Sequence, residues 1–142
     1  MVHTVEIISY TPKSDKAGRL TFKLGGNTYN ARCYADAALA DGLLVVGTTY
    51  PVSLTVEAEG SVEYAVATEP SFNVVKADEA GDRVEATGRT WDSFDHQVIK
   101  LDSNPTVGVK INLPQTATDY RGGSWLKATG TLCADLPPED HD

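Results

Sequence analysis

The stretch from Thr90 to Gln97 holds the densest group of side chains that could recognise a partner or move a proton. It places Trp91 and Phe94 beside Asp95 and His96. Aromatic side chains supply much of the binding energy at protein interfaces, so this stretch could form a recognition surface. In the alternative interpretation, the two rings plug one end of the fold and the aspartates cap turns, a common use of aspartate in loops.

Tyr120, Arg121 and Trp125 form a second candidate surface. In residues 123–136 the apolar side chains lie at even positions, whereas Trp125 shares the odd positions with Lys127. Because alternate strand residues point to opposite faces, this period directs Trp125 away from the interior. Trp125 would then make an aromatic and cationic patch with its two neighbours. If the strand began one residue later, Trp125 would instead belong to the core.

Neither surface carries a catalytic or metal-binding pattern. His96 has aspartates beside it, but a zinc site needs three or four ligands, and His3 and His141 lie far away in the sequence. The chain has no GxSxG elbow and no phosphate-binding GxxxxGK[ST] loop. We therefore expect no metal, no cofactor and a binding protein rather than an enzyme. A small enzyme whose residues meet only in the fold remains an alternative.

Cys33 and Cys133 belong to no CxxC motif and no Cys/His cluster. The simplest interpretation is two buried thiols that act as small apolar side chains. In an oxidising compartment they could instead close a loop of about 100 residues with a disulfide.

The elements that must position these residues are strands, because apolar and polar residues alternate with a period of two in at least six segments. An N-terminal hairpin is predicted around Gly25-Gly26-Asn27, since these residues tolerate the positive φ of a tight turn. A second hairpin is predicted around Gly60. Further strands are expected in the segments 84–88, 97–101, 107–113 and 126–134.

Other segments are expected to be short helices, a loop and a tail. Short helices are predicted at 36–41 and 116–120, and a long loop from 68 to 82. Residues 1–136 would form one domain, and 137–142, which follow the last strand, a disordered acidic tail.

Glycines inside the predicted strands suggest how the sheet is shaped. Gly88, Gly108 and Gly130 lie within strand patterns, where glycine commonly marks a bulge or a sharp bend. We therefore expect a mainly β fold, a single small antiparallel β-barrel or curled sandwich. The two Ala-Thr-Gly sequences that end at Gly88 and Gly130 are too brief to indicate an internal duplication.

From Gly47 to Leu136, the strand order and the closing segment 123–132 resemble an OB-fold barrel. The resemblance is one of pattern and includes no diagnostic motif. It implies that the middle strands and the loops beside them form the binding surface.

Charge and termini limit the partners and the compartment. The formal charge is −8, but Asp135, Glu139, Asp140 and Asp142 place four of the acidic residues in the tail region. The arginines are scattered in the sequence, which disfavours general binding to nucleic acid, although a fold could gather some of them. The first residues lack a signal peptide pattern and no stretch is apolar enough to span a membrane, so the cytoplasm is the expected compartment.

These observations together predict a non-catalytic binding module that recognises a protein partner through its aromatic loop surface. An OB-like binder of single-stranded nucleic acid or oligosaccharide is one alternative. An inhibitor or immunity-type partner of a basic protein is another, since an acidic chain attracts such a partner electrostatically. Open edge strands would also allow two copies of the chain to pair as a homodimer.

Overall fold

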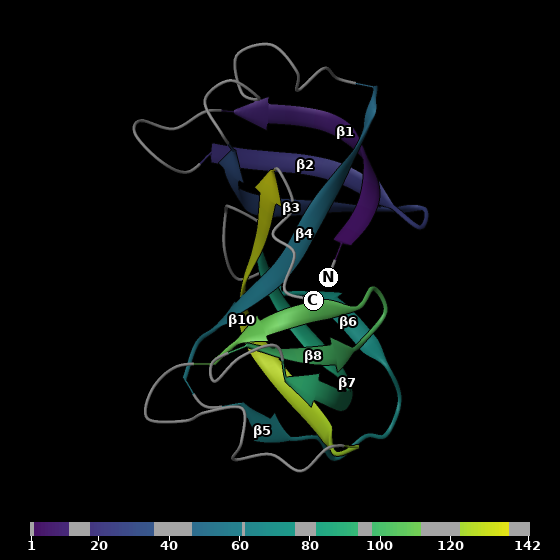
Figure 1. Ribbon diagram of the computed structural model, residues 1–142, viewed down its shortest axis with the longest axis vertical. Coiled ribbons are helices and arrows are strands. Elements are labelled where there is room, and N and C mark those ends of the chain that lie inside the picture. Colours follow the sequence, from purple (N-terminus) through teal and green to yellow (C-terminus); the bar gives the residue numbers. More distant parts are fainter. Residues whose placement is uncertain are drawn as a thin grey trace.

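The computed structural model describes residues 2–11, 18–35, 47–60, 62–75, 82–93, 98–111 and 123–136. In these ranges every helix or strand element is a strand (Figure 1). They are β1 (Val2–Thr11), β2 (Gly18–Leu24), β3 (Asn27–Ala35), β4 (Thr49–Ala58), β5 (Glu63–Tyr64), β6 (Ser71–Val74), β7 (Arg83–Ser93), β8 (Val98–Asp102), β9 (Val107–Lys110) and β10 (Trp125–Leu136). The predicted mainly β class is confirmed. The two predicted helices lie outside the described residues.

All the strands belong to one sheet, which closes on itself. The order is β5-β10-β3-β2-β1-β4-β9-β8-β7-β6, and β10 also pairs with β4 and β7. The pairing of β10 with β4 crosses the closed sheet and divides it in two. We call the circuit of β1, β2, β3, β10 and β4 the N-terminal ring, and the circuit of β7, β8, β9, β4 and β10 the C-terminal ring. In Figure 1, β4 and β10 run diagonally through both rings.

The two rings repeat one arrangement of strands. β1, β2 and β3 pair in antiparallel succession, and so do β7, β8 and β9. β4 closes the N-terminal ring by pairing antiparallel to β1, while β10 lies parallel to β3. In the C-terminal ring the roles are exchanged: β10 pairs antiparallel to β7 and β4 lies parallel to β9. The fold is therefore an internal structural repeat in which β1 to β4 correspond to β7 to β10.

An irregularity at the same place in both halves supports this correspondence. The register of β1 against β2 shifts between Ile7 and Ser9, and that of β7 against β8 shifts between Thr90 and Ser93. A shift of this kind bends a strand and increases its twist, which a small closed sheet requires. The Ala-Thr-Gly sequences lie in β7 and β10, which do not correspond to each other, so they do not mark the repeat.

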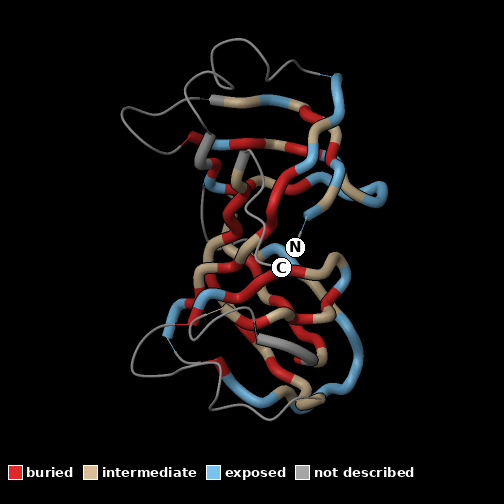
Figure 2. The backbone as a smooth tube through the Cα atoms, viewed as in Figure 1, coloured by how far each residue is buried: buried red, intermediate tan, exposed pale blue. Residues whose placement is uncertain are grey.

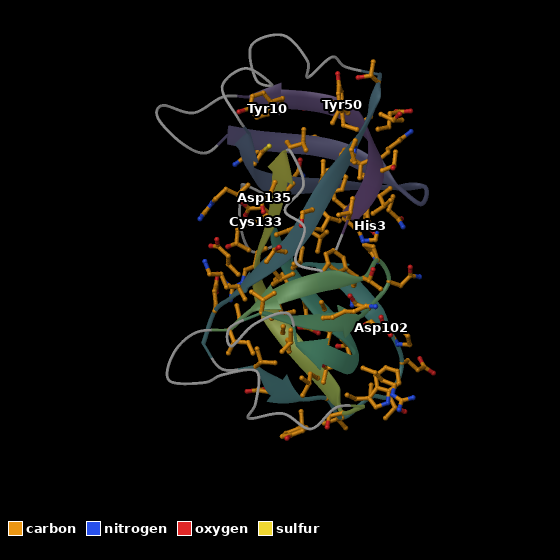
Figure 3. All side chains as sticks on the ribbon, viewed as in Figure 1. His3, Tyr10, Tyr50, Asp102, Cys133 and Asp135 are labelled. Carbon is orange, nitrogen blue, oxygen red and sulfur yellow. The ribbon has the colours of Figure 1, made fainter. Side chains whose placement is uncertain are left out.

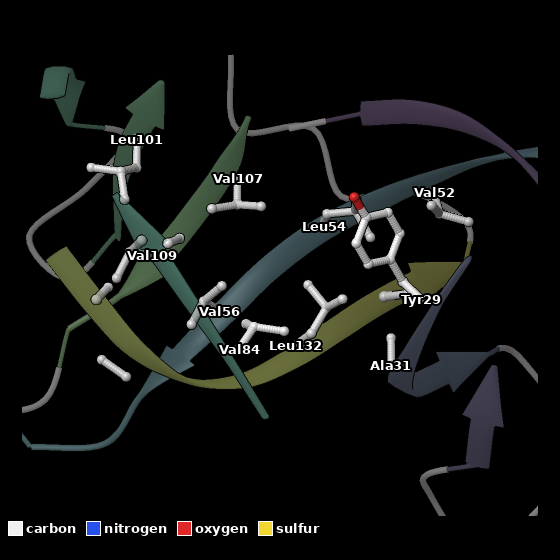
Figure 4. Packing of buried hydrophobic residues seen from close by; sticks show 14 of the residues in the cluster. Tyr29, Ala31, Val52, Leu54, Val56, Val84, Leu101, Val107, Val109 and Leu132 are labelled. Atoms are coloured by element: carbon white, nitrogen blue, oxygen red, sulfur yellow. The ribbon is translucent and has the colours of Figure 1, made fainter. Parts of the chain in front are cut away.

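Alternation of buried and exposed residues fixes which face of each strand points inward. In β2, for example, Leu20 and Phe22 are buried while Arg19 and Lys23 are exposed. The buried residues form one cluster with members in both rings. Figure 2 marks the buried positions in red along the backbone of both rings. Leu54 and Val56 of β4 and Leu132 of β10 lie at the centre of this cluster, where the rings join (Figure 4). The two rings thus share one core.

The local turn chemistry was predicted better than the pairing of distant strands. The hairpin of β2 and β3 forms around Gly25 and Gly26, which both have positive φ. The predicted hairpin around Gly60 is wrong: β5 pairs with β10, because β1, β10 and β9 already occupy the two edges of β4. The loop predicted for 68–82 contains a short strand, β6, on the edge of β7.

Glycines allow strands of the C-terminal ring to approach each other closely. A Cβ atom at Gly88 would overlap the backbone of Asp102, and one at Gly130 would overlap the carbonyl group of Glu57. Gly108 is less confined, since its Cβ would lie 3.4 Å from the nearest atom, Cγ1 of Val98. Two of the three predicted bend positions are therefore places where only glycine fits.

Candidate functional site

Trp125 begins β10 and lies on the outward face of the C-terminal ring. Its neighbours at even positions, Leu126 and Ala128, are fully buried, whereas Trp125 is half-buried. It stands directly opposite Arg89 of β7. The Nε atom of Arg89 donates a hydrogen bond to the carbonyl oxygen of Gly123 at 3.3 Å, which holds the guanidinium beside the start of β10. This is the outward orientation that the period of two indicates.

The backbone brings the described part of the first surface, at the end of β7, beside Trp125 of the second. The amide of Thr90 donates to the carbonyl oxygen of Ser124 at 2.9 Å, and the amide of Gly123 donates to the carbonyl oxygen of Thr90. The end of β7, which carries Trp91, therefore lies beside the start of β10. The side chain of Trp91 lies outside the described part of the structure, as do Phe94, Asp95, His96, Tyr120 and Arg121.

The segment on the other side of Trp125 adds apolar residues that the sequence analysis missed. The amide of Ala65 donates to the carbonyl oxygen of Trp125 at 2.9 Å, and Tyr64 pairs with Leu126. The side chain of Tyr64 is 61% exposed and Val66 is fully exposed. Because paired residues share a face, Tyr64 lies on the face of Leu126 and Trp125 on the other, at the same edge of the sheet. Only the pairing of β5 with β10 could have located Tyr64 and Val66 at this edge. We call Tyr64, Val66 and Trp125 the aromatic edge.

The fold gathers two of the scattered arginines on neighbouring strands of the N-terminal ring. Arg19 of β2 stands directly opposite Arg32 of β3, and both are exposed. Lys23, four residues after Arg19 on the same face of β2, is also exposed. Arg32 lies 3.9 Å from a carboxylate oxygen of Glu57. Like charges placed directly opposite each other destabilise a sheet unless an anion lies nearby. We call Arg19, Lys23 and Arg32 the basic face.

A pocket of about 260 Å³ opens between the rings, where the β2–β3 turn approaches the β8–β9 turn. These two turns occupy corresponding positions in the structural repeat. The pocket is lined by His3, Leu24, Gly25, Asn27, Tyr29, Asn104 and Pro105. No local sequence pattern could have indicated this pocket, because its lining comes from three segments that are distant in the chain.

His3 connects the two rings at this pocket (Figure 3). Its Nε2 atom lies 2.7 Å from the carbonyl oxygen of Thr106. A carbonyl oxygen can only accept a hydrogen bond, so Nε2 carries a proton and donates it. In the neutral ring the other nitrogen, Nδ1, is then a hydrogen-bond acceptor. Within the described residues Nδ1 has no recorded partner.

The two cysteines lie on neighbouring strands but on opposite faces. Cys33 stands opposite Ala134 on the interior face, whereas Cys133 stands opposite Arg32 on the other. Both thiols are free and buried, as the simplest interpretation of the sequence predicts. Burial raises the pKa of Cys33 to about 12, with the charge of Asp135 acting in the same direction. Burial also raises the pKa of Cys133 to about 12; Glu57 and Asp135 add to this and Arg32 opposes it. Neither thiol is therefore a nucleophile near neutral pH.

The described residues contain no group of three or more His, Cys, Asp or Glu side chains that could hold a metal ion. They also include no helix long and apolar enough to cross a membrane. In comparisons with known proteins, no family model, no curated protein and no solved structure matches this chain.

Proposed function

We propose that this protein is a non-catalytic interaction module that binds a protein partner through the aromatic edge. The observation that carries the proposal is the exposure of Tyr64 and Val66 on the segment that pairs with the start of β10, where Trp125 is half-buried. Exposed apolar side chains that gather on adjoining strands are typical of interaction surfaces. Aromatic residues are also enriched among the side chains that dominate binding energy.

The neighbouring charges favour a partner with basic residues around an apolar centre. Glu63 and Glu69 are exposed on the segment that carries Tyr64 and Val66. The cations beside Trp125 are already engaged, since Arg89 donates to the carbonyl oxygen of Gly123 and Lys127 lies 3.6 Å from a carboxylate oxygen of Glu85. An acidic rim around an apolar centre accelerates encounter with a basic partner and disfavours acidic ones.

Photo-crosslinking tests this proposal. A benzophenone amino acid replaces Val66 in one variant and Asn73, an exposed residue of β6, in the control. In an extract of the source cells we expect one dominant adduct from position 66 that is absent from position 73. The adduct protein is then purified and its affinity for the unlabelled chain is measured.

Substitutions decide whether the aromatic edge carries the affinity. With the purified partner, Trp125→Ala and Tyr64→Ser should each weaken binding by about 30-fold, the effect of losing a hot-spot side chain. Val74→Ser, a change at another exposed apolar residue, should leave the affinity unchanged. A partner that binds Trp125→Ala as tightly as the unchanged protein contradicts the proposal. An adduct between two copies of this chain would show instead that the edge is a homodimer contact.

The basic face supports a second candidate, an OB-like module for single-stranded nucleic acid. Each ring has five strands, the number in an OB-fold barrel, whose second and third strands form the binding face. In the N-terminal ring these strands are β2 and β3, which carry Arg19, Lys23 and Arg32. Filter binding at low salt tests it: retention of an oligonucleotide that Arg19→Ala abolishes would favour this candidate, and no retention would remove it.

A further inference from the structure

The pocket between the rings combines hydrogen-bonding groups with apolar walls, but none of the described residues that line it is an acid, a lysine or an arginine. A charged ligand would lose its hydration there without gaining an opposite charge. The composition of the pocket therefore selects an uncharged, polar ligand.

The hydrogen-bonding groups of the pocket suit hydroxyl groups. In the neutral imidazole of His3, Nδ1 is an acceptor, because Nε2 donates to Thr106. The amides of Asn27 and Asn104 each offer both donors and an acceptor. A ligand with several hydroxyls can match this mixture, since each hydroxyl both donates and accepts a hydrogen bond.

The apolar part of the lining favours a saturated ring over a nucleobase. Leu24 and Pro105 offer aliphatic surface on which the C–H face of a sugar ring could lie. Tyr29 is only 6% exposed, since its ring packs against Phe22 and Phe72, so it does not offer an open aromatic face for base stacking. The volume, about 260 Å³, lies just below the usual range for drug-sized ligands, which is appropriate for a single sugar unit.

The pocket is held in shape by contacts on both sides. On one side, Gly25 and Gly26 form a tight turn between paired strands. On the other, the hydroxyl of Ser103 donates to the carbonyl oxygen of Pro105 at 2.6 Å, and His3 reaches Thr106. A site that is already ordered loses less conformational entropy when it binds a ligand. We propose that this pocket is a binding site for one neutral sugar unit.

Titration of a ¹⁵N-labelled sample with methyl glycosides tests the proposal. The probes are methyl β-glucopyranoside, methyl α-mannopyranoside and methyl N-acetyl-β-glucosaminide. We expect saturable shifts of the amide signals of Gly25, Asn27 and Asn104 with at least one probe. A dissociation constant of about 1 mM is appropriate for so small a ligand. Uridine and inorganic phosphate serve as comparison ligands.

Two variants locate the binding. His3→Gln keeps a donor for the carbonyl group of Thr106 but removes the Nδ1 acceptor, and Asn27→Ala removes an exposed amide without altering the turn glycines. Each should weaken binding by about three- to tenfold, the effect of one lost hydrogen bond. Asn73→Ala, an exposed asparagine on β6, is the matched control and should bind as the unchanged protein does.

Three results would overturn the proposal: no saturable shift with any glycoside, saturation with uridine or phosphate instead, or equal affinity in folded His3→Gln and Asn27→Ala. The site lies apart from the aromatic edge, so crosslinking from position 66 should be unchanged in both variants. Failure of one proposal is therefore distinguishable from failure of the other.

Discussion

The two rings share a strand order but fill their interiors differently. The N-terminal ring uses large side chains: Phe22, Leu20 and Ile7 are fully buried, and the rings of Phe22 and Tyr29 lie 5.8 Å apart. Its glycines at 25 and 26 occupy a turn with open space around them. In the described part of the C-terminal ring the fully buried side chains are aliphatic, such as Ile99, Leu101 and Val84, and glycines lie within the strands.

This difference shows that one topology can be closed by two kinds of packing. The interior of the N-terminal ring holds the aromatic pair of Phe22 and Tyr29. In the C-terminal ring Gly88 and Gly130 let backbones approach each other directly. The N-terminal ring should therefore be sensitive to the loss of an aromatic side chain, and the C-terminal ring to a Cβ atom added at Gly88 or Gly130.

The largest predicted effect comes from adding one methyl group in the C-terminal ring. In Gly130→Ala the new Cβ would overlap the carbonyl group of Glu57 and lie 2.9 Å from Cα of Ala58, both backbone groups that cannot rotate away. We expect the free energy of unfolding to fall by at least about 3 kcal/mol. Urea denaturation followed by circular dichroism measures it.

Gly108→Ala is the matched control in the same ring. Its Cβ would make an ordinary contact, 3.4 Å from Cγ1 of Val98, and alanine loses less chain entropy than glycine on folding. Its stability should change by less than about 1 kcal/mol in either direction. If the two variants unfolded at the same urea concentration, close backbone approach would not be what distinguishes the C-terminal ring.

Sequence patterns predicted the features that depend on neighbouring residues. The alternation around Trp125 indicated its outward direction, and Gly25-Gly26-Asn27 indicated the hairpin. The glycines at 88 and 130, which predict bends, lie where backbones approach each other closely. Each of these follows from backbone preferences or from a period of two, both of which are properties of a single segment.

Sequence patterns could not predict which distant strands pair. A period of two specifies an inward face but not the strand beside it, so the pairing of β5 with β10 and the exposure of Tyr64 were missed. The pocket was missed for the same reason. His3 and Thr106 are 103 positions apart, and only the closure of both rings brings them together.

Alkaline pH should lower the free energy of unfolding, because the two thiols of the N-terminal ring are buried. Both cysteines keep their protons up to about pH 12 in the folded state, whereas the ordinary pKa is 9.0. Between these values the unfolded chain binds fewer protons than the folded protein, so stability falls as pH rises. The loss should approach about 1.4 kcal/mol per pH unit for each thiol. Urea titrations at pH 8 and pH 10 measure it.

The variant Cys33→Ala/Cys133→Ala is the control, and its stability should depend much less on pH over this range.

Urea titrations of the unchanged protein also compare the unfolding of the two rings. Both tryptophans, Trp91 and Trp125, belong to strands of the C-terminal ring, while thiol labelling reports on β3 and on the end of β10 in the N-terminal ring. Because the rings share β4 and β10, fluorescence and labelling should change together. Labelling that precedes the change in fluorescence would mean that the N-terminal ring opens by itself.

The smallest effect is expected from the ion pair between Arg83 and Glu59, which lies on the outside of the C-terminal ring. The charged atoms are 3.0 Å apart, but both side chains are about half exposed, so water screens their attraction. Glu59→Gln should lower stability by only a few tenths of a kcal/mol, and 1 M salt should erase the difference. Urea denaturation at low and high salt checks both statements. A loss above about 1 kcal/mol that persists in salt would contradict the argument that packing, and not surface charge, distinguishes the two rings. The stability losses of Glu59→Gln and Gly130→Ala can be compared directly, because both changes act on the same few residues at the end of β4.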